Sequence, residues 1–362
     1  MSVLIFILVI VALIVVHEFG HFVAAKWSGM RVDEFGLGYP PRAATVAKIG
    51  ETEYTLNWLP FGGFVKIYGE DGGGTDPRAF SKRPRILQAL VLVAGIAMNL
   101  VFAYVLITGA LVMGTPRALS GNELAVARDM ELVVANILPG SPAARAGLLP
   151  GDSILKAEDA QGRWSAADPK SFSAFVAGSN GDTIALEVKR DGKAQAVSAT
   201  PAEGIVPNDP SRYALGVEVA TVGVVSLPLG AAIVQGASLT WGATKLTATG
   251  LWHFFYSIFT LTANFSQVAG PIGIAGAVGT ASAQGLGDLL SLMAIISINL
   301  ALINLIPIPA LDGGRLLFVI IESIIRRPIK PSFAHALNAV GFVFLVLLMV
   351  VVTAHDIFRI IG

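Results

Sequence analysis

Residues 3–25 form an apolar run of 23 residues, and its only ionisable side chains are His17, Glu18 and His21. A helix of this length crosses the hydrocarbon of a bilayer, about 30 Å thick. Residues four apart share one face of a helix, so His17 and His21 point the same way and can bind one zinc ion. Glu18 is directed towards the open coordination position, where it can accept a proton from water. The spacing is typical of metalloproteases.

This run has two other interpretations. Histidines near a helix end can contact lipid headgroups, but polar groups at membrane depth are costly unless they are paired or bind a ligand, which favours the metal. An N-terminal apolar run can also be a secretory signal peptide. Here it lacks a basic leading segment and a small-residue cleavage site, so we expect a retained span.

Composition supports a membrane protein with several spans, since 54% of the 362 residues are hydrophobic and only 14% are charged. The net charge of zero gives no sign of a nucleic-acid partner. The chain has no cysteine, so any metal must be bound by His, Asp or Glu. We expect four transmembrane helices, at residues 3–25, 86–113, 289–306 and 337–354. In the second span we interpret Asn99 as a helix-packing residue rather than a functional one.

The connector at residues 26–85 contains nine basic residues, which places it in the cytoplasm by the positive-inside rule. Residues 35–41 read as a turn-rich loop. Residues 45–49 and 52–58 predict a β-hairpin, and residues 61–67 a further short strand. These strands either dip back into the membrane under protein cover or form a plain cytoplasmic hairpin, and the sequence leaves both open.

Residues 114–227 are charged, punctuated by Gly and Pro, and rich in predicted strands. A strand, a short helix capped by Ser141, a turn at residues 150–152 and a further strand follow one another. This pattern resembles one PDZ domain at about residues 123–201. The Gly-Leu-Gly-Phe-like loop that binds a peptide carboxylate is not evident at its usual place. Because the domain follows the second span, we expect it outside the cytoplasm.

Residues 228–284 predict an amphipathic helix at the membrane interface and a connector. The third span contains Asn304 and breaks at Pro307 and Pro309, and Asp312 follows directly. A carboxylate between two apolar runs is a second costly placement, so we expect Asp312 to complete the metal site with the two histidines. The alternative is that Asp312 caps a helix. The domains are therefore expected at 1–113, 114–227, 228–284 and 285–362, the first and last forming the membrane core.

The His17-to-His21 motif, one PDZ insert and the sequence Asn304-Leu-Ile-Pro-Ile-Pro-Ala-Leu-Asp-Gly-Gly314 occur here in that order. With them the chain resembles the site-2 protease family, in particular the bacterial regulator-of-sigma-E protease type. The resemblance covers essentially the whole chain. One departure is the single PDZ domain, where the sigma-E enzyme has two.

The resemblance implies a multi-span α-helical membrane protein with membrane-associated β elements and an inserted α+β PDZ domain. It implies an intramembrane zinc metalloprotease of the bacterial inner membrane, with its active site near the cytoplasmic face. His17, His21 and Asp312 match the metal ligands and Glu18 the catalytic glutamate. Asn304, Pro307 and Pro309 match the substrate-accommodating motif. The implied substrates are single-pass membrane proteins such as anti-sigma factors or remnant signal peptides, and the PDZ domain would bind a peptide or protein.

Two other functions are weighed against proteolysis. A PDZ-bearing membrane scaffold with a structural metal would have four protein ligands, whereas three are found. A metal transporter would show paired inverted repeats, which we do not find.

Hydrolysis also requires water at the metal, and we expect Gly20 and the glycines of the connector to leave room for a path from the cytoplasmic face.

Overall fold

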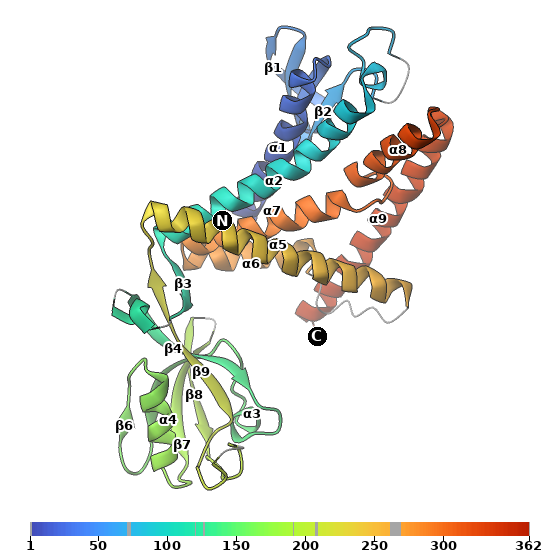
Figure 1. Cartoon of the computed structure of the whole chain (residues 1–362). Coiled ribbons are helices and arrows are strands. Elements are labelled where there is room, and N and C mark those ends of the chain that lie inside the picture. The colour runs from blue at the N-terminus through green and yellow to red at the C-terminus, as the bar shows by residue number, and fades with distance from the viewer. Residues whose placement is uncertain are drawn as a thin grey trace. The chain divides into compact units, whose positions relative to one another are not determined.

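The protein is described from a computed structural model, which covers residues 2–70, 74–119, 121–125, 127–190, 192–206, 209–260 and 269–361. The chain divides into two compact units. One contains Met1–Val112 with Pro228–Gly362, and the other is Met113–Leu227. Each unit is described by itself (Figure 1).

Among its described residues, the first unit has four helices that are long and apolar enough to cross a membrane, as expected. They are α1 (Ser2–Trp27), α2 (Arg85–Met113), α7 (Leu286–Leu305) and α9 (Pro331–Ile361). The other helices of this unit are the 3-10 turn η1 (Phe80–Lys82), α5 (Leu229–Phe259), α6 (Pro271–Gln284) and α8 (Asp312–Ile325). The helix expected at the interface corresponds to α5, and residues 261–268 of the expected segment 228–284 lie outside the described residues.

Two long strands, β1 (Val32–Ile49) and β2 (Thr52–Ile67), follow α1 and form a small sheet. Residues 34–37 each have two ladder partners, one in residues 63–66 and one in residues 53–56. The expected loop at residues 35–41 is therefore wrong, because it belongs to β1. Its glycines serve close approach: a Cβ on Gly36 would lie 2.5 Å from the Phe64 ring. The separate strand expected at residues 61–67 is also wrong, since it continues β2.

Helices α1 and α2 cross at Gly20, where a Cβ would lie 2.4 Å from the carbonyl oxygen of Ala94. Small residues allow such close backbone approach in membrane helix pairs. Gly20 is thus buried against α2, and the expectation that it leaves room for water is wrong. Next to this crossing, Ala25 of α1 and Val91 of α2 pack with Val32 and Ile67 in one apolar cluster. The cluster ties the sheet to the helix pair.

The second unit is one mixed domain with a seven-stranded sheet in the order β3-β9-β4-β5-β7-β8, β6 pairing with β5. Its elements are β3 (Thr115–Ala118), η2 (Gly121–Ala125), β4 (Arg128–Ile137), α3 (Pro142–Arg145), β5 (Ser153–Glu158), β6 (Arg163–Trp164), α4 (Pro169–Gly178), β7 (Ile184–Arg190), β8 (Lys193–Ala199) and β9 (Val217–Val225). This agrees with the inserted α+β domain expected. The sheet extends beyond residues 123–201, however, because β9 pairs with β4 in its interior.

In the second unit, a helix cap and a buried ion pair lie around the turn before β5. Ser141 caps α3 as expected, its side chain accepting from the backbone N–H of Ala144. Asp152, almost fully buried, accepts from the backbone N–H of Leu149 and pairs with Arg190 at 2.6 Å. The guanidinium of Arg190 holds the pKa of the Asp152 carboxyl below its usual range. This pair therefore stabilises the domain at neutral pH, and its contribution is lost as pH falls through that lowered pKa.

Candidate metal centre

Three side chains from opposite ends of the chain meet within the first unit. Nε2 of His17 lies 2.9 Å from Oδ2 of Asp312, and Nε2 of His21 lies 3.2 Å from the same oxygen. The two imidazole nitrogens are 3.1 Å apart. Both histidines are buried, and the Asp312 side chain is 18% exposed. Among the described residues, His17, His21 and Asp312 are the group of side chains that could bind a metal ion together.

The three atoms fit a zinc ion in size and in chemistry. Tetrahedral zinc with bonds of about 2.0–2.2 Å holds its ligand atoms roughly 3.3 Å apart. The observed triangle is only slightly smaller. Nδ1 of His21 donates to the carbonyl oxygen of Val91 at 2.8 Å, which leaves the Nε2 lone pair of that ring free for a metal. Three protein ligands leave one position for water, as in catalytic zinc sites.

One stripe of α2 supports both histidines. Val91, Gly95 and Asn99 are spaced by four residues and therefore share a helix face. Val91 supplies the carbonyl that fixes the His21 ring. Gly95 lies under that ring, since a Cβ there would be 2.3 Å from Nε2 of His21. Asn99 places Nδ2 of its amide 3.2 Å from Nδ1 of His17.

Asp312 is placed by the break between α7 and α8. Leu311 is the N-cap residue of α8 and Asp312 is the first helical residue. The alternative of Asp312 as the cap is therefore wrong. A Cβ on Gly313 or on Gly314 would lie within 2.4 Å of carbonyl oxygens in residues 305–308, so only glycine permits this tight return.

One turn further along α8, an ion pair fixes the helix to the first unit's N-terminal half. Arg315 pairs with Glu70, which follows β2. Since Arg315 and Asp312 are three residues apart on the same helix, this contact also restrains Asp312.

Glu18 follows His17 on α1 and faces the sheet. A Cβ on Gly63 of β2 would lie 3.6 Å from Cγ of Glu18, so the glutamate lies close to this part of the strand. The ladder partners of residues 63–67 all lie in residues 32–37, on one side of the strand. Among the described residues, the other side of this segment is thus an unpaired sheet edge next to Glu18.

The remaining site residues from the sequence lie near the break and outside the ligand cluster. Asn304 is half-buried in the last turn of α7. Pro307 and Pro309 lie in the segment between α7 and α8. Pro309 contacts α9, since a Cβ on Gly341 would be 2.1 Å from its carbonyl oxygen. No direct contact of these three residues with the histidines is found among the described residues.

A cavity of about 910 Å³ lies between α2 and α8. Gln88 and Leu92 line it from α2, and Arg315 and Glu322 line it from α8. Leu92 follows the residue that bonds His21, and Arg315 lies one turn from Asp312. The cavity therefore reaches the neighbourhood of the ligand cluster and is large enough to hold many water molecules.

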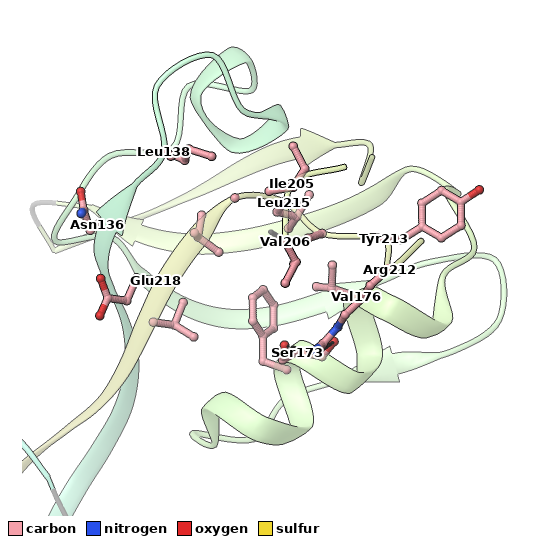
Figure 2. Close-up of a pocket in the computed structure, with 15 residues that line it drawn as sticks. Asn136, Leu138, Ser173, Val176, Ile205, Val206, Arg212, Tyr213, Leu215 and Glu218 are labelled. Atoms are coloured by element: carbon pink, nitrogen blue, oxygen red, sulfur yellow. Dashed lines mark hydrogen bonds between the residues drawn. The ribbon is translucent and has the colours of Figure 1, made fainter. Parts of the chain in front are cut away.

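The second unit has a separate pocket of about 360 Å³, between α4 and the start of β9 (Figure 2). Leu138, Val176 and Leu215 give it an apolar lining, and Arg212 donates to Ser173 at 2.7 Å on its rim. Strand β9 pairs with β4 along residues 217–224, but with β3 only from Val222 onward. Its first residues thus offer an open edge beside the pocket.

Replacing Gly95 by alanine is expected to displace His21 and to weaken zinc binding by about 10- to 100-fold, the scale on which changes around a metal ligand lower metal affinity. The physical reason is the 2.3 Å separation between the new Cβ and Nε2 of His21. Zinc content after dialysis against a weak chelator measures the effect.

Gly109→Ala is the matched control on the same helix, because its Cβ would meet only Leu290 at an ordinary 3.6 Å. Equal zinc content in the two variants would show that Gly95 does not position His21.

The sequence analysis gave no role at the metal site to Val91, Gly95, Arg315 or Glu70, and it interpreted Asn99 as a helix-packing residue. One signal was present: Gly95 and Asn99 are a small and a polar residue four apart in an apolar span. A carbonyl such as that of Val91 leaves no mark in the sequence, because every residue carries one.

Comparison with known proteins gives a consistent result. The sequence profile of Peptidase family M50 matches residues 5–348. A protein named "Putative zinc metalloprotease" from Clostridium perfringens is 36% identical over 347 residues, which cover 96% of this chain and 95% of that protein. Proteins with the same name from Nostoc sp. and Synechocystis sp. are 34% and 33% identical, cover 95% and 96% of this chain, and are themselves covered to 93% and 92%.

Among solved structures, the PDZ domain of the SdrC-like protein from Listeria innocua is similar to part of this chain. It is 21% identical, with a TM-score of 0.21, and the match covers 25% of this chain and 92% of that domain.

Proposed function

Because this chain belongs to peptidase family M50, and so is a zinc metalloendopeptidase, we propose that it hydrolyses peptide bonds within or near the transmembrane segment of single-pass membrane proteins. The observation that carries this proposal is the meeting of His17, His21 and Asp312, with Glu18 adjacent, in a unit whose helices are long enough to cross a membrane. Anti-sigma-factor-like proteins and signal-peptide remnants are the substrate classes we propose.

Each residue of the cluster has a separate role in this proposal. His17, His21 and Asp312 hold the metal, and zinc bound there would acidify a water molecule and polarise the scissile carbonyl. Glu18 accepts the proton of the attacking water and passes it to the leaving amine. The rival proposal, a scaffold with a structural metal, is disfavoured because a structural zinc site takes four protein ligands.

The substrate must be extended when it is cut, because a helix buries its peptide bonds in its own hydrogen bonds. The unpaired edge of β2 at residues 63–67 supports strand addition, in which the substrate backbone takes up the free ladder positions. Because Gly63 lies close to Glu18, a strand bound at this edge would lie near the base. Asn304 and the segment with Pro307 and Pro309 are proposed to accommodate the substrate as it unwinds.

Water is proposed to arrive through the cavity between α2 and α8. Its lining includes Lys82, Arg85 and Lys330, and such basic residues are typical of the cytoplasmic side. These residues support our proposal that the metal lies near the cytoplasmic face of a bacterial inner membrane. We also propose that the PDZ domain, which follows the second span, lies outside the cytoplasm.

Removing the metal tests the proposal. The purified chain in proteoliposomes is expected to cleave a co-reconstituted single-pass protein, to lose this activity with a zinc chelator, and to regain it when zinc is restored. Mass spectrometry would place the cut relative to the transmembrane segment. Cleavage that persists without zinc would contradict the proposal. Zinc flux across the same vesicles without cleavage would favour a transporter.

The pocket of the PDZ domain favours a second role, the binding of an extended peptide. The open edge of β9 can pair with a peptide backbone, and the apolar pocket can take one of its side chains. The segment at residues 213–216 lines this pocket directly before β9, and we propose that it receives the peptide carboxylate.

Leu138→Glu is expected to weaken binding of a peptide with an apolar C-terminal residue at least tenfold, because a charge would enter the apolar lining. Fluorescence anisotropy of labelled peptides on the full chain measures this. Leu149→Glu is the control, since both leucines are about half exposed (52% and 50%) and Leu149 does not line the pocket. Equal affinities in the two variants would remove the pocket from peptide binding.

A further inference from the structure

The side chain of Asn99 contacts the metal cluster, but only one of its two polar atoms has a hydrogen-bond partner among the described residues. The residue is fully buried in α2. Its backbone carbonyl, which belongs to α2, accepts from the Ser297 hydroxyl at 2.8 Å. Its side-chain nitrogen Nδ2 faces Nδ1 of His17 at 3.2 Å, but its side-chain oxygen Oδ1 is buried without a hydrogen-bond partner among the described residues. A buried, unpaired amide oxygen is rare and costly.

Histidine chemistry explains the unpaired oxygen. A neutral imidazole has one N–H and one lone pair. When Nε2 of His17 gives its lone pair to a metal, Nδ1 must carry the proton and needs an acceptor. A half-turn of the Asn99 amide exchanges Nδ2 and Oδ1, and places the oxygen where the nitrogen now stands. The unpaired oxygen and the Nδ1 proton then satisfy each other.

The other amide orientation satisfies the other tautomer. With Nδ2 facing Nδ1, His17 accepts at Nδ1 and donates from Nε2 to Asp312, a contact of 2.9 Å. One amide can therefore pair with His17 in both proton arrangements, whereas an apolar side chain pairs with neither. His21 needs no such group, because Val91 offers a backbone carbonyl, which only accepts.

We propose that Asn99 is a positioning residue for the metal: its side-chain oxygen accepts from Nδ1–H of His17 and thereby directs the Nε2 lone pair of that ring to zinc. This inference rests on the proposed role of His17 as a ligand. It assigns α2 a specific part in metal binding, since Val91 orients one histidine and Asn99 the other.

Zinc affinity of the purified full chain, measured by competition with a chromophoric chelator, tests the inference without any cleavage assay. Asn99→Leu keeps the volume but offers no acceptor, and is expected to weaken zinc binding by about 10- to 100-fold. Asn99→Asp keeps an acceptor oxygen at the same place and is expected to stay within about threefold of the parent chain. The visible absorption of the cobalt-loaded chain, which reports ligand geometry, is expected to change in Asn99→Leu only.

Two controls separate positioning from packing. Ser297→Ala removes the hydrogen bond to the Asn99 backbone but not the amide, and is expected to leave zinc affinity unchanged. Asn299→Leu removes an amide whose only hydrogen bond among the described residues is to Ile295 of its own helix, and it is also expected to have no effect. Wild-type affinity and cobalt absorption in Asn99→Leu would overturn the inference, as would equal losses in Asn99→Leu, Asn99→Asp and Ser297→Ala. A parent chain that binds no zinc at this cluster would overturn the proposed metal site itself.

Discussion

Replacing Glu18 by glutamine is expected to lower the rate of peptide-bond cleavage by at least about 100-fold, the lower end of what a general base contributes. Glutamine has nearly the same shape as glutamate but cannot take up a proton from water. His17, His21 and Asp312 are unchanged, so we expect zinc to remain bound at full stoichiometry. A co-expressed single-pass substrate would accumulate uncut, and it could be recovered with the inactive chain from native membranes and identified.

Glu53→Gln is the matched control for this change. Glu53 lies on β2 and pairs with Arg42 and Lys48, not with the ligand cluster. The same chemical substitution there is expected to leave cleavage unchanged. Cleavage by the zinc-loaded Glu18→Gln chain at the parent rate would show that Glu18 is not the base, and the proposed mechanism would fall.

Replacing Asp312 by alanine is expected to remove zinc as well as activity. The carboxylate is one of three ligands, and its Oδ2 lies within 3.2 Å of both imidazole nitrogens. Losing a group that only hydrogen-bonds to a ligand costs roughly 10- to 100-fold in affinity, and we expect the loss of a ligand itself to exceed that. Metal analysis of the purified chain should find far less than one zinc per chain.

Asp288→Ala serves as the control, since Asp288 lies in the first turn of α7 and is not part of the cluster. Full zinc occupancy in Asp312→Ala would show that the third ligand is a different residue. Asp312→Ala and Glu18→Gln test different steps. Glu18→Gln is expected to lose cleavage but keep zinc, whereas Asp312→Ala is expected to lose both.

Much of the membrane core follows from local patterns. Apolar runs of sufficient length predicted the four spanning helices, because length and hydropathy alone decide whether a helix can cross hydrocarbon. The small sheet was less predictable. Glycines and prolines at residues 35–41 read as a turn, but pairing on both sides of residues 34–37 made that stretch part of a strand. Long-range pairing of this kind outweighs local propensity.

The candidate site also has a part that the sequence predicts and a part that only the tertiary structure shows. The sequence by itself determined the ligand types, because the chain lacks cysteine and because His17, Glu18, His21 and Asp312 are too costly in apolar surroundings to be there without a role. Only the tertiary structure decided what holds those side chains in place: the carbonyl of Val91, the space above Gly95 and the amide of Asn99. The physical reason is that a costly residue stands out in its own segment, whereas a carbonyl, a missing Cβ or a buried amide gains its meaning only from the neighbour that folding brings against it.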